Sequence, residues 1–305
     1  MLASRILFVI LTGIFSTAQC GLVPSPSRIP SKGVQSTHLP DQYSSPKSRP
    51  PLLYDVSRIR HQRFAHGINL YSSQDEQLLG NRLATVIEQH SQIISDPLIV
   101  KYLRRLEETI SRNSDAQSPI KIKVVRDVEV NAYSLPGGFI YVQGGLVLAT
   151  ENEAQLVAAL SHEAAHIAGR HFTRLVTQQR VWKWSLLVAT GPLGYLLNRK
   201  AVPIFLARSL RSAELEADLL GLQNQYASGY DPTEFVNLIN NISSEQQKPT
   251  FADRVRDSHP PLEVRIRRAQ GCIRNYLPPR PEAIVDTSQF QEFKARVTEL
   301  MGWSR

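Results

Sequence analysis

The feature that most constrains this chain is the run His162-Glu163-Ala-Ala-His166, which lies in a stretch with helical periodicity. Apolar residues recur around it at intervals of three and four, from Leu156 to Ala168, as expected of a helix with one face in the core. Residues four apart lie about 40° apart around a helix, so both imidazoles point the same way and can share one metal ion. Glu163 lies one step round, where its carboxylate can reach a metal-bound water without being a ligand. The run therefore predicts a helix that carries a zinc site.

A catalytic zinc needs a third protein ligand and an open position, and the sequence offers two candidates. His171 lies nine residues beyond His162, about 180° round a continuous helix, so we expect it to face away as an ordinary polar histidine. Glu214 and Asp218 are four apart and project from one face of a later helix, while Glu216 is expected to turn outward. One carboxylate of that pair can ligate zinc, and the other can accept the ring N–H of a ligand histidine. The acidic pair is therefore the favoured source of the third ligand.

Composition excludes several classes of protein. Of the 305 residues, 42% are hydrophobic and 20% are charged, which excludes a wholly disordered chain, a collagen-like fibre and a polytopic membrane protein. The cysteines are Cys20 and Cys272, too few for a disulfide-built fold or a four-thiolate zinc finger.

The chain is basic, with 35 Lys and Arg against 27 Asp and Glu and a formal net charge of +8. Such a balance indicates an anionic partner. We find no module of interleaved basic and aromatic residues, so we expect no nucleic acid as a partner. Peripheral contact with a membrane, an anionic envelope surface or an acidic substrate segment fits better. Part of the positive charge lies in the N-terminal arm, and part surrounds His259, at Arg254, Arg256, Arg265, Arg267 and Arg268.

The N-terminal residues have the pattern of a targeting signal followed by a flexible tether. Arg5 precedes a ten-residue apolar run at 6–15, and small residues follow, so we interpret residues 1–20 as a secretion signal. The run is too short for a membrane span, and Thr-Ala-Gln before Cys20 matches a lipobox poorly, which leaves a lipid anchor as the less favoured alternative. Residues 21–66 are rich in proline and serine and are expected to form a flexible tether. The mature protein should then work outside the cytoplasm, in a periplasm or secreted.

Residues 67–305 are expected to form one α+β domain that is mainly helical. Ser73 and Glu76 have capping-box spacing before a first helix, and Thr150 and Glu153 have it before the long helix. A small sheet is expected next to that helix, with strands at 120–125 and 139–142. Further helices are predicted at 96–112, at 209–227 and from residue 288 onwards.

A second apolar run at 184–197 is broken by Gly191-Pro192. At about fourteen residues it is too short to span a bilayer, so a buried hairpin is the favoured interpretation. A surface loop that touches lipid is the alternative.

Four motifs give the chain a resemblance to a known family. They are Asn131-Ala-Tyr-Ser-Leu-Pro-Gly-Gly138, His162-Glu-x-x-His166, Arg211-x-x-Glu214-x-x-Ala217-Asp218 and Ser258-His259-Pro260. In these the chain resembles the zinc endopeptidases that include the CAAX prenyl proteases, HtpX and the periplasmic protease BepA. The resemblance runs from about Ser73 to the C-terminus and is closest to the soluble branch. One departure is Leu210, where the family usually has a serine.

The resemblance implies a gluzincin-like zinc-metalloprotease domain with one Zn²⁺, held by His162, His166 and Glu214, with Asp218 and Arg211 supporting the ligands. It also bears on His259, which on spacing alone would be a structural loop residue. We expect His259 to come over the metal, where it either caps the fourth position or donates to the oxyanion.

These features predict a zinc-dependent endopeptidase that acts on unfolded or misassembled proteins outside the cytoplasm. A metal-activated water would attack the scissile carbonyl, with Glu163 as the general base. The peptide is expected to lie extended along the strand Phe139-Ile140-Tyr141-Val142. The alternative is a binding or chaperone-like factor in envelope protein quality control that uses the same fold with little proteolysis.

Overall fold

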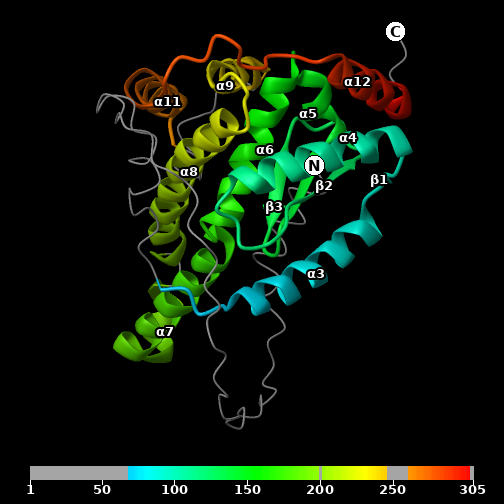
Figure 1. Ribbon diagram of the computed structural model, residues 1–305. Coiled ribbons are helices and arrows are strands. Elements are labelled where there is room, and N and C mark those ends of the chain that lie inside the picture. Colours follow the sequence, from blue (N-terminus) through cyan, green and yellow to red (C-terminus); the bar gives the residue numbers. More distant parts are fainter. Residues whose placement is uncertain (1–67, 199–200, 246–259, 303–305) are drawn as a thin grey trace, which may run out of the picture. The chain divides into compact units, whose positions relative to one another are not determined.

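A central helix, α6 (Glu153–Ala168), lies between a small sheet and a group of C-terminal helices (Figure 1). The computed structural model describes residues 68–198, 201–245 and 260–302. Before α6 the chain forms α3 (Ser73–His90), β1 (Ile93–Ile94), α4 (Pro97–Asn113), β2 (Lys121–Val125), β3 (Ala132–Leu135), β4 (Phe139–Gln143) and α5 (Gly144–Ala149). After it come α7 (His171–Asn198), α8 (Ala201–Ala227), α9 (Thr233–Glu245), α11 (Leu262–Tyr276) and α12 (Ser288–Met301). The predicted α+β class, mainly helical with a small sheet beside the long helix, is confirmed.

The sheet is mixed, with the strand order β1-β2-β4-β3. β2 runs parallel to β4, whereas β1 and β3 run antiparallel to their neighbours β2 and β4. The tight turn between β3 and β4 needs glycine, because Gly137 and Gly138 both have positive φ angles, 80° and 98°. β4 is therefore a central strand, and β3 is the last strand on its side of the described sheet.

Alternate residues of the strands face two different helical layers. Ile122, Val124, Ile140 and Val142 point into the main core, which α4, α6 and α12 complete. On the opposite face, the side chains of Lys123 and Tyr141 donate to Glu88 of α3 at 2.6 and 2.7 Å. A second apolar cluster joins α8, α9 and α11 to the far side of α6. α6 is thus held on both sides, so side chains on it are fixed relative to α8.

The first helix begins one residue earlier than its predicted capping box. Ser72 is the N-cap, and it forms a reciprocal capping box with Asp75. The predicted pair, Ser73 and Glu76, was wrong because the Glu76 carboxylate is used elsewhere. It is buried and accepts from the guanidinium of Arg170 at 2.9 Å.

The start of α6 was also placed on the wrong residue. Asn152 is the N-cap, and its side chain accepts from the backbone N–H of Gln155 at 3.0 Å. Thr150 instead ends α5, and Glu153 is fully buried, where the hydroxyl of Tyr102 donates to it at 2.9 Å. The boundary of α6 is nevertheless within the expected range.

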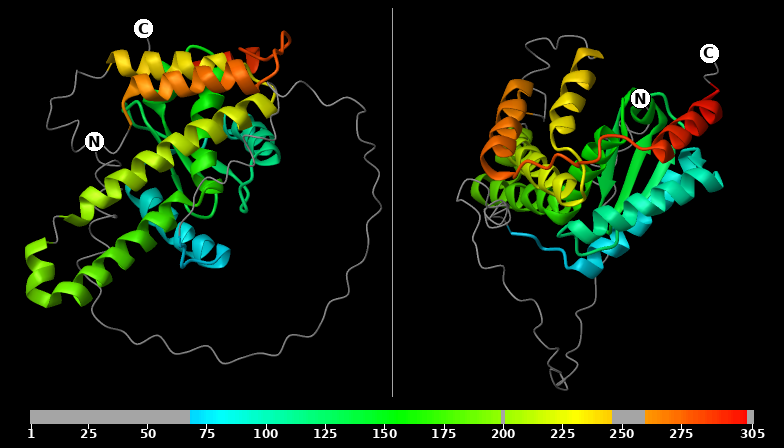
Figure 2. Two further views of the ribbon diagram at one scale, coloured as in Figure 1. Left: turned by 90° about the vertical axis from the view of Figure 1, so that its left-hand side faces the viewer. Right: turned by 45° about the horizontal axis from the view of Figure 1, so that its top comes forward.

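The apolar run at 184–197 does not form a buried hairpin in its described part. It lies in α7, which has a kink at Gly191 (φ 70°) and runs beside α8 as an arm that projects from the body (Figure 2). Trp184 is 66% exposed and Val188 is 83% exposed, so this expectation was wrong. No helix in the described ranges combines the length and apolar character needed to cross a bilayer.

Several sequence predictions lie outside the described residues. These are the signal at 1–20, the tether at 21–66 and the position of His259.

Candidate metal centre

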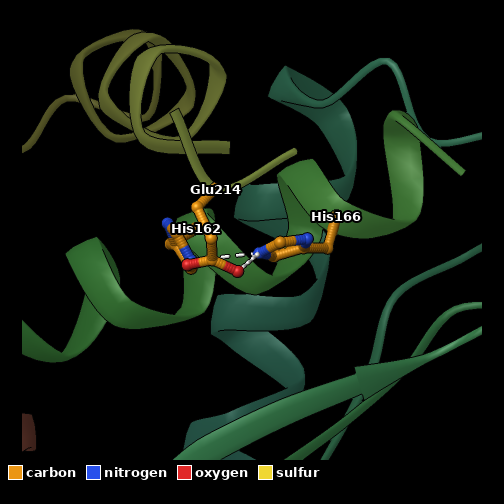
Figure 3. A group of neighbouring side chains, drawn as sticks. All are labelled: His162, His166 and Glu214. Carbon is orange, nitrogen blue, oxygen red and sulfur yellow. Dashed lines mark hydrogen bonds and ion pairs between the residues drawn. The ribbon is translucent and has the colours of Figure 1, made fainter. Parts of the chain in front are cut away.

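Three predicted ligands, His162, His166 and Glu214, meet between α6 and α8 (Figure 3). The Nε2 atoms of His162 and His166 lie 3.1 Å apart. Oε2 of Glu214 lies 3.6 Å from Nε2 of His162, and Oε1 lies 3.4 Å from Nε2 of His166. Ligand atoms of a tetrahedral zinc with bonds of 2.0–2.1 Å are about 3.3 Å apart. Two imidazoles and one carboxylate at these spacings fit one zinc ion.

A glycine allows α8 to approach α6 closely enough for this arrangement. A Cβ on Gly221 would lie 2.8 Å from the Cα of His162 and 2.9 Å from its backbone nitrogen. Glu214 and Asp218 precede Gly221 by two turns and one turn on the same helix. The close crossing therefore carries both carboxylates to the imidazole of His162.

Asp218 lies behind the first ligand, as predicted. Its Oδ1 is 3.1 Å from Nδ1 of His162, within ion-pair distance, although that nitrogen makes no well-aligned hydrogen bond among the described residues. Burial alone would lower the pKa of His162, but the carboxylates of Asp218 and Glu214 raise it to about 10. The pocket thus favours a cation here, either a proton on the imidazole or a metal ion in its place.

Asp218 is supported by Arg265 of α11, which the sequence did not assign to the site. Arg265 donates to both oxygens of Asp218, at 2.8 and 2.6 Å. Burial opposes ionisation of Asp218, yet Arg265 and then His162 hold its pKa below the usual value. Arg211 lies on α8 one turn before Glu214, and its buried Nε has no hydrogen-bond partner in the described part of the chain. The sequence had placed Arg265 only in a basic cluster, because nothing in its spacing marks a contact 47 residues away.

His171 and Glu216 do not face away from the site, and both expectations were wrong. α6 ends at Ala168, and Arg170 has a positive φ of 54°, so the helix is not continuous. The turn brings His171 back, buried, with its Nδ1 only 2.8 Å from Nδ1 of His166. Glu216 is also buried, and its carboxylate lies 3.4 Å from Nε2 of His171. Gly169 could have indicated from the sequence that the helix ends before His171, since a glycine often follows the end of a helix.

Glu163 lies on α6 directly after the ligand His162. It is half-buried on α6, next to His162. Burial opposes the charge of Arg265, but Asp218, with smaller contributions from Glu214 and Glu163, raises the pKa of that guanidinium. A carboxylate that lies near the metal ligands without being one of them is suited to proton transfer.

The predicted peptide-binding strand is not available for backbone pairing. β4, which contains Phe139, Ile140, Tyr141 and Val142, is buried throughout and lies between β2 and β3. Residues 139–143 pair with β2 and residues 139–142 pair with β3. An added peptide therefore cannot bond to β4, and one edge of the described sheet is β3, which packs against α6.

Comparison with known proteins agrees with this geometry. The chain is 25% identical over 228 residues to the beta-barrel assembly-enhancing protease of Yersinia pestis, a match that covers 70% of this chain and 46% of that protein. For the Escherichia coli K12 protein of the same name the figures are 24% over 237 residues, 72% and 48%. For the mitochondrial metalloendopeptidase OMA1 of Schizosaccharomyces pombe they are 28% over 183 residues, 58% and 53%. The chain spans about half the length of these curated relatives.

The family profile of Peptidase family M48 matches residues 98–273. This range is more than half of the chain, and it contains α6, α8 and all three candidate ligands. The chain belongs to Peptidase family M48.

Proposed function

We propose that this protein is a zinc-dependent endopeptidase. The observation that carries the proposal is the convergence of His162, His166 and Glu214, with atoms spaced as ligands of one ion. Zinc in such a site lowers the pKa of water and polarises a carbonyl group. Glu163 takes the proton from the attacking water and later delivers it to the leaving amine. The Asp218 carboxylate, 3.1 Å from Nδ1 of His162, favours the ring proton on that nitrogen and so keeps Nε2 free to bind the ion.

The peptide substrate pairs with β3 rather than with β4. The backbone oxygen of Asn131 accepts from the N–H of Gln143 in β4 at 3.0 Å. Because backbone groups alternate in direction along a strand, Tyr133 also bonds towards β4, while Ala132 and Ser134 point away from it. The outward groups of Ala132 and Ser134 can hold an extended peptide without reading its side chains, which suits a protease for many sequences.

We infer that the substrates are unfolded or misassembled proteins outside the cytoplasm. The support is the secretion signal predicted at residues 1–20 and the similarity to proteases named for β-barrel assembly. An extended peptide on a strand edge requires a locally unfolded substrate, since a folded chain has already paired its own backbone.

The exposed middle part of α7 supports peripheral contact with a membrane. Trp184 and Val188 are highly exposed there, and the exposed cation Arg180 lies a turn earlier. Tryptophan is favoured at the boundary between lipid and water, where its ring is buried and its N–H stays wet. We propose that this part of the arm rests on an anionic membrane surface.

The function is tested by comparing the wild type with Glu163→Gln on an unfolded protein, each with zinc and with a chelator. We expect the wild type to cleave only with zinc. The variant should retain zinc and lose at least about a hundredfold in rate, the usual contribution of a general base. Equal cleavage by both proteins would refute the role of Glu163. Zinc binding without cleavage by either protein would favour a binding or chaperone-like factor.

A further inference from the structure

We propose that His171 is a positioning residue for the metal ligand His166, and that Glu216 in turn orients His171. This inference rests on the zinc site proposed above. Nδ1 of His166 lies 2.8 Å from Nδ1 of His171, and Nε2 of His171 lies 3.4 Å from the carboxylate of Glu216. All three side chains are largely buried, with His171 4% exposed and Glu216 7% exposed.

An irregular turn between α6 and α7 brings His171 to this position. On a continuous helix His171 would lie about 180° from His162 and could not reach the site. Instead Arg170 adopts a left-handed conformation (φ 54°), which costs a residue with a side chain about 1 kcal/mol or more. The Arg170 guanidinium is held by Glu76 at 2.9 Å, and Thr173 also donates to that carboxylate. α3 therefore stabilises a turn whose result is the contact between the two imidazoles.

The turn also leaves a space shaped for the second imidazole. A Cβ on Gly169 would lie 2.3 Å from Nε2 of His171 and 2.8 Å from two of its ring carbons. The ring thus packs directly against the backbone of Gly169. A side chain at position 169 would therefore displace the imidazole of His171 and break its contact with His166.

The proton arrangement follows from the chemistry of the ligand. Nε2 of His166 faces His162 and Glu214, so a metal bound there leaves the ring proton on Nδ1. Two nitrogens 2.8 Å apart share one proton between them, so Nδ1 of His171 must accept. The neutral ring of His171 then carries its own proton on Nε2, which lies 3.4 Å from the Glu216 carboxylate and makes no other contact of this kind among the described residues.

Each ligand histidine is therefore backed by a buried carboxylate, but by different routes. Asp218 contacts His162 directly. Glu216 acts on His166 through His171. Because Asp218 and Glu216 lie two residues apart on α8, one helix orients both ligands and also supplies Glu214. Hydrogen-bonded partners of this kind fix the ring and typically contribute 10–100-fold to metal affinity.

The test measures zinc affinity by competition with a chromophoric chelator, for the full chain and two variants. His171→Leu removes the acceptor at similar volume, and we expect the dissociation constant for Zn²⁺ to rise about 10–100-fold. In His171→Asn the amide oxygen stands near the position of Nδ1, and we expect affinity within about fivefold of the wild type. Circular dichroism of the zinc-free proteins shows whether each variant folds.

The wild type provides a second measurement that needs no substitution. Nitrogen-15 NMR of histidine-labelled protein with zinc should show His171 protonated on Nε2 and unprotonated on Nδ1. Protonation on Nδ1 would overturn the proposal, as would a His171→Leu variant that folds and binds zinc as the wild type does. Equal weakening by His171→Asn and His171→Leu would also overturn it. A wild type that binds no zinc would instead refute the metal site itself.

Discussion

At the scale of single residues, the two carboxylates of the acidic pair differ in the groups that lie closest to their oxygens. Arg265 donates to both oxygens of Asp218, which is 2% exposed. Glu214 is 12% exposed, and both of its oxygens face the imidazole nitrogens. A carboxylate that accepts two hydrogen bonds from a guanidinium is a weakened metal ligand. These contacts support the proposal that Glu214 holds the ion and that Asp218 supports His162.

The edge strand gives a prediction for a single residue, Ser134→Pro. The N–H of Ser134 points away from β4, so proline there removes no bond within the sheet, and edge positions of this kind tolerate proline. It does remove a donor to the substrate backbone. We expect kcat/KM for an unfolded substrate to fall about 3–10-fold, as for the loss of one hydrogen bond.

Ser134→Ala is the matched control, since it keeps the N–H and should cleave as the wild type does. Zinc content should be unchanged in both variants. Wild-type kinetics for Ser134→Pro would show that the substrate does not pair with β3.

At the scale of elements, the local sequence pattern was sufficient for α6 and insufficient for its neighbours. Helical spacing alone places His162 and His166 on one face, because that property depends on four consecutive residues. The same reasoning failed for His171, since one left-handed residue at Arg170 changes the direction of the chain. The central position of β4 depends on the order in which strands pair, and no spacing within a strand reports that order.

Contacts between distant elements were equally hidden. Arg265 comes from α11, and its partner Asp218 lies on α8. A resemblance to known motifs identified Glu214 and Asp218, but it gave no sign that Arg265 pairs with Asp218. The three residues that converge as candidate ligands were predictable from the sequence, while most of those that contact them were not.

The crossing of α6 and α8 predicts the effect of Gly221→Ala. Alanine normally favours a helix by about 1 kcal/mol over glycine. Here its Cβ would meet the backbone of His162 at 2.8 Å, so the two helices must separate. We expect a net loss of about 1–3 kcal/mol in the free energy of unfolding of the zinc-free protein, with weaker zinc binding.

Gly271→Ala in α11 is the control, because a Cβ there meets nothing within 4 Å. It should raise the free energy of unfolding by roughly 0.5–1 kcal/mol and leave zinc affinity unchanged. Urea denaturation of the zinc-free proteins and chelator competition measure both quantities. A Gly221→Ala variant as stable as Gly271→Ala would contradict the importance of the close crossing.

At the scale of the whole molecule, the cations of the described residues lie both at the metal centre and on the exposed surface. Of the five arginines that surround His259 in the sequence, Arg265 is paired with Asp218, and Arg267 and Arg268 are exposed. The described surface therefore presents cations on α11 and a separate exposed apolar segment on α7. An anionic membrane could bind both kinds of surface, since basic side chains contribute about 1 kcal/mol each near anionic lipids.

The exposed segment of α7 predicts weaker binding of a double variant, Trp184→Ser with Val188→Ser, to anionic vesicles. The side chains are 66% and 83% exposed, so the wild type can bury both of them in the membrane interface. Without this burial, binding of the variant should be weaker by roughly 2 kcal/mol, or about 30-fold in the partition coefficient. Co-sedimentation with vesicles measures it, with residues 1–20 removed because their apolar run at 6–15 would itself bind lipid. The control is Leu78→Ser with Val86→Ser on α3, where two apolar side chains are also exposed, 57% and 42%. Equal losses of binding by both double variants would show that α7 is not the membrane-binding surface, and so would wild-type binding by the α7 variant. A loss that only the α7 variant shows, and that is larger on anionic than on neutral vesicles, would support α7 as that surface.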